Sequence, residues 1–151
     1  MKALNTMKLE FESRSVNESF ARVAVASFVS QLDPTVEELC DIKTAVSEAV
    51  TNSIVHGYKE GKGKIYITVS VFENANVRIR IKDKGCGIEN VEEAMQPLFT
   101  TMGGERAGLG FAVMESFTDK IKVRSVVGNG TIVTLEKKIN GRFLKNDSRS
   151  N

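Results

Sequence analysis

The sequence predicts an α+β domain: a two-layer α/β sandwich with a mixed, mostly antiparallel sheet and helices on one face. Two observations favour this class. A first short strand is followed by two segments whose apolar residues recur at helical spacing. Later come two pairs of alternating strands, each pair around a turn, with a long irregular segment and a helix between the pairs. Strands joined by short turns pair antiparallel, and the helices can then cover one face of the sheet.

The composition is that of one soluble domain. The chain has 151 residues, 41% hydrophobic and 26% charged, with a net charge of +2. Because this charge is small and the lysines and arginines are scattered along the sequence, we expect no direct nucleic-acid partner. The longest apolar stretch, residues 23–29, is far shorter than the ~20 residues of a membrane span, so we expect no membrane association.

The two cysteines and the single histidine indicate the compartment and exclude one class of metal site. Cys40 and Cys86 occur without a signal-peptide core at the start of the chain, which favours a reducing cytoplasm. With His56 as the only histidine, a structural zinc site is not expected.

The first half of the chain predicts a strand and two helices. Residues 7–11 alternate apolar and polar and form the strand. Asn17 can cap the first helix, which Asp33 and Pro34 end. Its apolar residues recur at helical spacing: Phe20, Val23, Ala24, Phe28 and Leu32.

The second helix is expected over residues 36–56. Thr35 and Glu38 have the spacing of a capping box at its start. Its buried stripe is expected to consist of Leu39, Ile42, Val46, Ala49, Val50 and Ile54.

The second half predicts two hairpins around a functional loop. The elements are strands at 65–72 and 77–81, an irregular segment at 84–106, a helix at 108–117, and strands at 121–127 and 131–139. An irregular segment of this length is typical of a lid or a binding loop. We expect residues 1–139 to form the domain and residues 140–151 to form a polar tail.

Three separate segments could carry chemistry, and the first lies on the second helix. Glu48 and Asn52 are four residues apart and share one helical face, which His56 continues. The Asn52 oxygen could bind Mg²⁺, and Glu48 could accept a proton from an attacking hydroxyl. The alternative is a solvated polar stripe on an amphipathic helix.

The second segment follows a strand. Asp83 ends the strand and could accept a hydrogen bond from the exocyclic amine of adenine. Gly85 and Gly87 would let the backbone approach a ligand closely. The alternative is an ordinary turn at the end of a strand, for which aspartate and glycine are common residues.

The third segment opens the last helix. Gly108, Leu109 and Gly110 could form a phosphate cradle, and Arg106 could neutralise a terminal phosphate. No Gly-Lys-Ser or Gly-Lys-Thr follows, so this is not a Walker loop. A helix start with incidental glycines and an exposed loop arginine are the alternatives. Thr131 could contact a base or be an ordinary strand residue.

Together these segments resemble the ATP-binding fold of the Bergerat (GHKL) ATPase-kinase superfamily, which includes DNA gyrase B, ninety-kilodalton heat-shock chaperones, sensor histidine kinases and MutL. Residues 48–52 resemble its N box, residues 83–87 its first glycine box and residues 108–110 its second. The resemblance therefore implies the histidine-kinase-like ATPase fold, with ATP and Mg²⁺ as cofactors.

A closer resemblance is to the anti-sigma F family of endospore-forming bacteria, with anti-sigma B type kinases as the neighbouring possibility. It covers about residues 7–139. Five short strings of residues carry this resemblance, and the last of them, Gln96–Thr101, is highly specific. These strings are Asn17–Val23, Gln31–Thr35, Val46–Asn52, His56–Tyr58 and Gln96–Thr101.

This second resemblance implies a cytoplasmic homodimer with two activities. It would bind a sporulation RNA polymerase sigma factor, and it would transfer the ATP γ-phosphate to a serine of an anti-anti-sigma protein. The resemblance implies Glu48 as general base, Asn52 as Mg²⁺ ligand, Arg106 as a terminal-phosphate contact and Arg22 as a partner-binding residue. The further nucleotide contacts it implies are His56, Asp83, Gly85, Gly87, Thr100, Thr101, Gly108, Leu109, Gly110 and Thr131.

Two other functions stay open at this point. One is a sensor-histidine-kinase-like catalytic domain, against which the chain has one histidine and no preceding phosphoacceptor helix pair. The other is a non-catalytic module that sequesters a sigma factor in a nucleotide-dependent way. One departure from the family pattern is the segment 101–106, which is shorter and richer in glycine than the family's lid.

Overall fold

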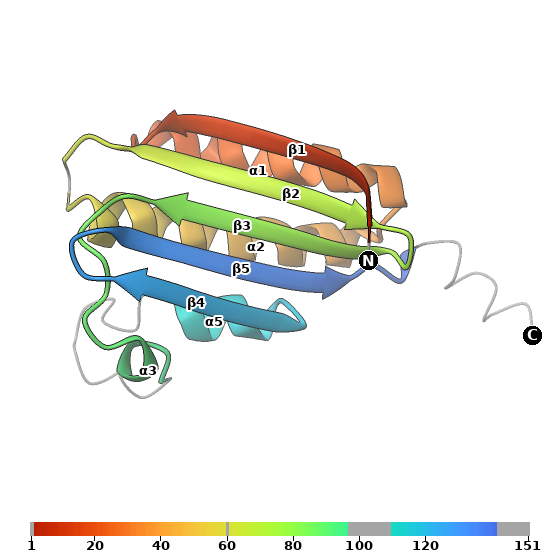
Figure 1. Cartoon of the computed structure of the whole chain (residues 1–151). Helices are drawn as coiled ribbons and strands as arrows, with labels where there is room; N and C mark the ends of the chain where they lie inside the picture. The colour runs from red at the N-terminus through yellow and green to blue at the C-terminus, as the bar shows by residue number, and fades with distance from the viewer. Residues whose placement is uncertain (1, 60, 97–109, 142–151) are drawn as a thin grey trace, which may run out of the picture.

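The computed structural model describes residues 2–59, 61–96 and 110–141, and within them the chain forms two layers (Figure 1). One layer is a five-stranded sheet, and the main helices cover one of its faces. The predicted α+β class is therefore confirmed. All pairings between described strands are antiparallel, so the sheet contains no parallel pair within these ranges.

Four described helical segments lie in the first half of the chain, and two further described helices lie in the second half. Their bounds are α1 Val16–Val29, the short 3₁₀ turn η1 Ser30–Leu32, α2 Val36–Asn52, the π-turn η2 Ser53–Gly57, α3 Val91–Ala94 and α5 Phe111–Ser116. Within the described ranges, no helix has both the length and the apolar character that a membrane span requires.

The strands are joined in the order β1-β2-β3-β5-β4 across the sheet. Their bounds are β1 Ala3–Glu12, β2 Lys64–Phe72, β3 Asn76–Asp83, β4 Lys120–Val126 and β5 Gly130–Lys138. The chain leaves β3 at the centre, crosses to the β4 edge, and returns through β5. This crossover places the end of β3, the end of α2 and the β4–β5 turn at the same end of the molecule (Figure 1).

The core lies between the sheet and the helices. Alternate residues of β2 and β3 are almost fully buried, as the sequence predicted, and so are α2 residues at helical spacing. The buried residues that the sequence had singled out are Ile42, Val46, Ala49, Val50, Ile65, Ile67, Val69, Val71, Val77, Ile79 and Ile81.

Helix α1 differs from the prediction in its start and its buried face. Ser15, not Asn17, precedes the helix, because the Asn17 side chain donates instead to the Glu12 carbonyl at 2.9 Å. The buried residues of α1 are Ala21, Val25, Ala26 and Val29, and Phe28 packs partly buried against the same core. Two apolar residues of the expected repeat, Phe20 and Val23, are 52% and 55% exposed. They therefore leave an apolar strip on the surface of α1.

The capping box at the start of α2 is confirmed, and its glutamate also holds the end of β5. The Glu38 N–H donates to Thr35 Oγ1 at 3.1 Å, and the Thr35 N–H donates to Glu38 Oε1 at 2.9 Å. The same carboxylate accepts the N–H groups of Asn140 at 2.7 Å and Gly141 at 3.1 Å. Burial alone would raise the pKa of Glu38, but these backbone donors outweigh it and lower the pKa below its usual value.

We expect Glu38→Ala to lower the free energy of unfolding by about 3 kcal/mol at neutral pH, because three backbone N–H groups lose a charged acceptor. When folding lowers the pKa of a carboxyl, the ionised group stabilises the folded protein at pH values above its unfolded-state pKa. This stabilisation is lost as the pH falls through the folded-state pKa. The cost of the substitution should therefore shrink below about pH 4. Urea unfolding at neutral and acid pH measures this cost, with Glu37→Ala, at an exposed position of the same helix, as control. An equal cost at both pH values would contradict a role for the charge.

Candidate functional site

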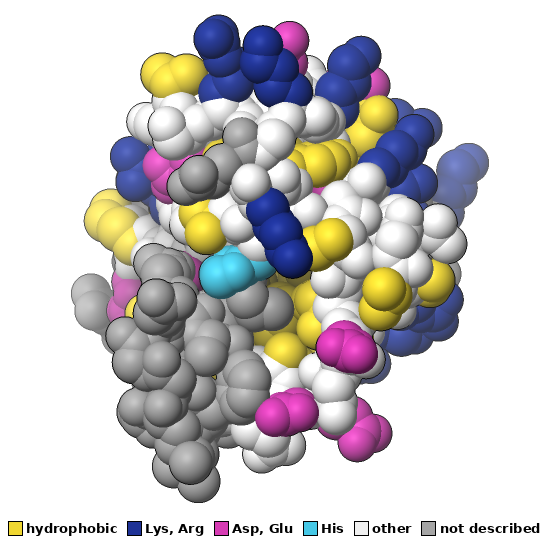
Figure 2. Space-filling model, turned by 90° about the vertical axis from the view of Figure 1, so that its left-hand side faces the viewer, with side chains coloured by type: hydrophobic (Ala, Val, Ile, Leu, Met, Phe, Trp, Pro, Cys, Tyr) yellow, Lys and Arg dark blue, Asp and Glu magenta, His cyan; other side chains and the backbone are white. Residues whose placement is uncertain are grey.

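A hollow of about 230 Å³ opens at the end of the molecule where α2 and β3 both end. Figure 2 looks onto this end of the molecule, and apolar side chains are visible within the hollow. Its walls come from four parts of the chain that are far apart in sequence. The lining residues are Ala49, Asn52, Ser53, His56, Gly57, Lys59, Asp83, Cys86, Gly87, Ile88, Phe111, Thr131 and Val133.

A change of helix type at the end of α2 shapes one wall. Ser53–Gly57 form a π-turn, closed by the Tyr58 N–H, which donates to the Ser53 carbonyl at 2.9 Å. The Gly57 carbonyl accepts the Cys86 N–H at 2.8 Å, which ties the turn to the segment after β3. Single π-turns in α-helices occur frequently at functional sites. The sequence predicted a continuous helix to His56, and the structure corrects this to an α-helix that ends at Asn52.

Asp83 is the buried carboxylate of the hollow. It is 4% exposed, although it ends the central strand β3. Its Oδ2 accepts the Ser53 hydroxyl at 2.8 Å, and its Oδ1 accepts the Gly85 N–H at 2.9 Å. These two donors hold the carboxylate in one orientation at the wall of the hollow. Carboxylate oxygens have further lone pairs, so Asp83 can also accept a hydrogen bond from a ligand amine.

Three glycines allow neighbouring backbone segments to pack closely around Asp83. A Cβ at Gly57 would lie 3.0 Å from Asp83 Oδ2, and a Cβ at Gly85 would lie 2.1 Å from the Gly57 carbonyl oxygen. At Gly130, where φ is +113°, a Cβ would lie 2.1 Å from the Asp83 carbonyl oxygen. A side chain at Gly85 or Gly130 would force backbone segments apart, so the close packing of this wall requires glycine there.

Thr131, the partner of Asp83 across the β3–β5 pairing, is held in place by a hydroxyl network. It is 8% exposed, and its Oγ1 lies 2.8 Å from the hydroxyl of Ser125. Ser125 also accepts the Ile88 N–H at 2.7 Å and donates to the Gly130 carbonyl at 3.1 Å. The network joins β4, β5 and the segment after β3. Ser125 is thus a framework residue that sequence reasoning missed, because nothing in a strand serine indicates its contacts.

Glu48 and Gly110, which directly precede the lining residues Ala49 and Phe111, lie against each other. Gly110 precedes α5 with φ +70°, and a Cβ there would lie 2.3 Å from Glu48 Oε2. The carboxylate therefore lies directly against the Gly110 backbone, one helical turn before Asn52. The sequence predicted that this helix starts at Gly108, but the described helix begins at Phe111 because the left-handed conformation of Gly110 is not helical.

The Tyr58 hydroxyl connects β2 to the segment after β3, beside the hollow. Its hydroxyl donates to the Lys64 carbonyl at 2.5 Å and accepts the Lys84 N–H at 2.7 Å. Burial raises the pKa of the Tyr58 hydroxyl, against the lowering effect of the Lys84 N–H, and the charge of Asp83 raises it further. The hydroxyl consequently stays protonated at neutral pH and joins the ends of β2 and β3.

The hollow combines apolar walls with one polar edge. Ile88, Phe111 and Val133 supply apolar surface, while Asp83 and Thr131 supply hydrogen-bonding groups. This combination fits a flat heteroaromatic ring with an exocyclic amine. Among the described residues, no group of three or more histidine, cysteine, aspartate or glutamate side chains could bind a metal. Asn52 lines the hollow, and its amide oxygen is a ligand of the kind that Mg²⁺ takes together with water and phosphate oxygens.

Comparison with known proteins agrees with this geometry. The family described as histidine kinase-like ATPase domain matches residues 11–137. The anti-sigma F factor of Priestia megaterium is 53% identical over 145 residues, which are 94% of this chain and 99% of that protein. The anti-sigma F factor of Clostridium acetobutylicum is 56% identical over 135 residues, or 89% of this chain and 94% of that protein.

The chain belongs to the anti-sigma F factor family. It is thus an anti-sigma factor of the GHKL type, as the resemblance in its sequence had implied. Solved structures agree on the fold alone. The RsbU and RsbW domains of a Mycobacterium tuberculosis protein match with a TM-score of 0.64 at 18% identity, over 89% of this chain and 32% of that one. The histidine kinase domain of an Erythrobacter litoralis blue-light activated kinase matches with a TM-score of 0.58 at 20% identity, over 86% and 64%.

The structure brings many of the predicted site residues together. Asn52, His56, Asp83, Gly87 and Thr131 line the hollow. Gly85, Glu48 and Gly110 each directly precede a lining residue in the chain. Arg22 lies elsewhere, on α1, where it pairs with Glu18 at 3.9 Å. Five predicted residues lie outside the described residues: Thr100, Thr101, Arg106, Gly108 and Leu109.

Several lining residues had not been predicted. Ser53 orients Asp83, and Lys59 brings a positive charge to the rim. The Cys86 thiol, whose role was open, contacts the His56 carbonyl at 3.2 Å, so it helps to connect the π-turn to the loop after β3. Ser53 directly follows the motif residue Asn52, and Cys86 lies between two motif glycines. These positions, next to or within the predicted motifs, were the signals in the sequence by which Ser53 and Cys86 could have been found.

Proposed function

We propose that this protein is an anti-sigma factor and a protein-serine kinase. It binds a sporulation RNA polymerase sigma factor, and it transfers the γ-phosphate of ATP to a serine of an anti-anti-sigma protein. One observation carries the proposal. Four parts of the chain that are distant in sequence converge on one hollow, and Glu48, which directly precedes the lining residue Ala49, lies against Gly110. A binding module alone would not need a carboxylate in that position.

The buried end of the hollow is the proposed adenine site. Asp83 accepts a hydrogen bond from the exocyclic amine, which selects adenine over guanine because guanine presents a carbonyl oxygen there. Ser53 and the Gly85 N–H hold the Asp83 carboxylate for this contact. Thr131 supplies a second polar contact, and the apolar walls pack against the faces of the ring.

The phosphates are proposed to extend from the hollow towards Glu48 and Gly110. Asn52 Oδ1 would hold Mg²⁺, whose charge lowers the cost of negative charge on the phosphates in the transition state. Glu48 accepts the proton of the serine hydroxyl as its oxygen attacks the γ-phosphorus. The bond from that phosphorus to the bridging oxygen of ADP then breaks, and ADP leaves. Arg106 and the 108–110 segment remain proposed phosphate contacts.

Helix α1 carries the proposed partner surface. Arg22 is a long cation on this helix, and the neighbouring Phe20 and Val23 are more than half exposed. A cation among exposed apolar side chains is typical of protein interfaces. We propose that the sigma factor and the anti-anti-sigma protein bind here, and that the active form is a homodimer. A partner that belongs to RNA polymerase would place this activity in the cytoplasm.

Transfer of label from γ-labelled ATP tests the proposed function directly. Purified protein, Mg²⁺ and a cognate anti-anti-sigma protein should yield an acid-stable phosphoserine on the partner. An acid-labile phosphohistidine would instead indicate a histidine-kinase-like activity. Nucleotide binding without any transfer would leave only the sequestering module, and the kinase proposal would be wrong.

We expect Asn52→Ala to lower the affinity for ATP in the presence of Mg²⁺ by about tenfold, because one ligand of the ion is lost. Without Mg²⁺ the variant and the wild type should bind ATP with similar affinity. Isothermal titration calorimetry with Mg²⁺ and with chelator separates the two conditions. Ser47→Ala, on the same helix, is the control. Equal affinities of Asn52→Ala and wild type in Mg²⁺ would remove Asn52 as a ligand.

A further inference from the structure

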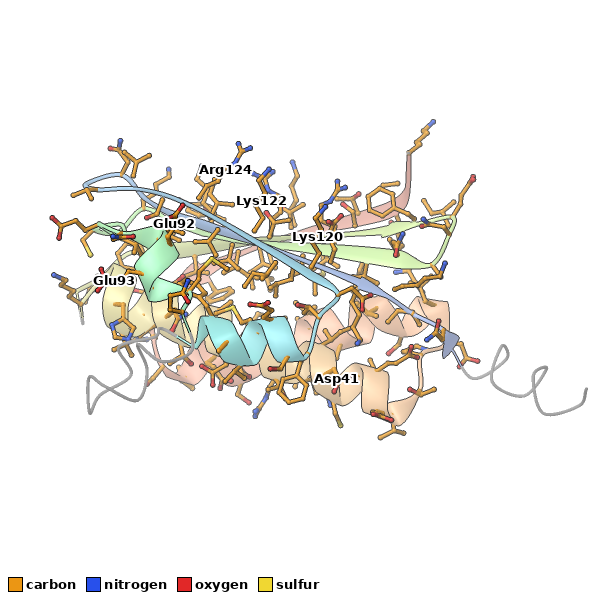
Figure 3. The ribbon with its side chains drawn as sticks, turned by 90° about the horizontal axis from the view of Figure 1, so that it is seen from below. Asp41, Glu92, Glu93, Lys120, Lys122 and Arg124 are labelled. Atoms are coloured by element: carbon orange, nitrogen blue, oxygen red, sulfur yellow. The ribbon has the colours of Figure 1, made fainter. Side chains whose placement is uncertain are left out.

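The face of the sheet opposite the helices carries a basic trough. Lys120, Lys122 and Arg124 project from β4 on this side, away from α2 and α5 (Figure 3). Arg78 and Arg80 of β3 are exposed on the same face, because Val77, Ile79 and Ile81 alternate with them into the core. These five cations line a shallow hollow of about 550 Å³, together with Ile121, Ile132, Thr134 and Glu136.

Strand register arranges the cations in two columns. Arg78 lies opposite Glu136, which lies opposite Lys120. In the next row, Arg80 lies opposite Thr134, which lies opposite Lys122. The columns on β3 and β4 are therefore about 10 Å apart, and successive cations within a column are about 7 Å apart. Strand β5 forms the floor between them, with Ile132 and Thr134 half-buried.

The net positive charge of the trough is larger than the net charge of the whole chain. Five cations face one carboxylate there, whereas the net charge of the whole sequence is +2, so the remainder of the chain is net negative. Among the described residues, Arg78 with Glu136 at 3.3 Å is the one ion pair within the trough. The sequence suggested scattered cations, and the structure corrects this, because pairing of β3 with β5 and of β5 with β4 gathers them. The repulsion between the columns acts within a Debye length of about 10 Å and would be relieved by an anion.

The shape and chemistry of the trough favour an acidic protein segment. A helix about 10–12 Å wide can lie over the trough along β5 and reach both columns, and its carboxylates at four-residue spacing, about 6 Å apart, can meet successive cations. Among the residues that the structure describes, no aromatic side chain lines the trough, so a nucleic-acid base has no ring on which to stack there. None of its lining residues is a large exposed apolar side chain that could enter a membrane.

We propose that this basic trough is a docking surface for an acidic helix of a partner protein. It lies on the opposite face of the sheet from α1 and Arg22, and it does not include the nucleotide hollow (Figure 1). The surface therefore does not depend on the proposed kinase activity, and a partner bound there leaves both other sites open.

A fluorescent alanine-rich helical peptide with glutamate at every fourth position is the probe. We expect it to bind the full chain at low salt, and we expect Arg80→Glu with Lys122→Glu to weaken binding at least tenfold. The matched control is Lys2→Glu with Lys8→Glu, which makes the same change in net charge at exposed positions outside the trough. The control should change the affinity by no more than about twofold. Fluorescence anisotropy measures each affinity.

Three results would overturn the proposal: no binding of the acidic peptide, an equal loss in both double variants, or stronger trough-dependent binding of an oligothymidine or of phosphatidylserine vesicles. The last result would assign the trough to a nucleic acid or to a membrane. If the charge-reversed protein does not fold, the milder Arg80→Gln with Lys122→Gln variant replaces it, and at least a threefold loss is then expected.

Discussion

Glu48→Gln should lower the rate of phosphate transfer to the partner serine by about 10²–10⁴-fold, the range that loss of a general base produces. The amide has nearly the same shape as the carboxylate, so its contact with Gly110 can persist. It cannot accept the proton of the serine hydroxyl. Since Glu48 is absent from the lining of the hollow, ATP affinity should change by no more than about threefold.

Single-turnover transfer of γ-label and calorimetric titration with ATP measure the two quantities separately. Glu37→Gln is the matched control, because it makes the same chemical change at an exposed position in the first turn of the same helix. It should leave both quantities unchanged. Transfer by Glu48→Gln at the parental rate would show that another group takes the proton, whereas loss of ATP binding would assign Glu48 to the nucleotide site instead.

Gly85→Ala should abolish nucleotide binding, with a loss of affinity of more than about 100-fold and a loss of stability of about 3 kcal/mol. The new Cβ would lie 2.1 Å from the carbonyl oxygen of Gly57, a backbone atom that cannot rotate away. The π-turn and the end of β3 must then separate. Separation breaks the Cys86 N–H contact to Gly57 and withdraws the Gly85 N–H from Asp83.

The control for this effect is Gly128→Ala in the adjacent β4–β5 turn. Its φ is +86°, so alanine costs about 1 kcal/mol in strain there, but a Cβ meets no atom within 4 Å. Thermal unfolding and ATP titration of both variants distinguish crowding from the general cost of replacing a glycine. Similar effects of the two substitutions would contradict the close packing of Gly85 against Gly57.

Much of the fold could be predicted because local patterns agree with the tertiary structure. Alternation in residues 65–71 and 77–81 matches strands with one buried face, and the Thr35–Glu38 capping box marks the start of α2. Helix α1 was predicted less well. Its periodic apolar residues include Phe20 and Val23, which are exposed, because Ala21, Val25, Ala26 and Val29 face the core instead. Periodicity alone does not show which face of a helix finds a neighbour.

The sequence by itself determined the family and the residue types of the candidate site: an acid and an amide one helical turn apart, an acid before two glycines, and a family pattern across the chain. Only the tertiary structure decided how these groups meet. It ended α2 in a π-turn, placed Ser53 on Asp83, and set Glu48 against Gly110. It also gathered scattered cations of β3 and β4 into one trough. The physical reason is that contacts between distant segments depend on strand order and register, which short-range patterns do not encode.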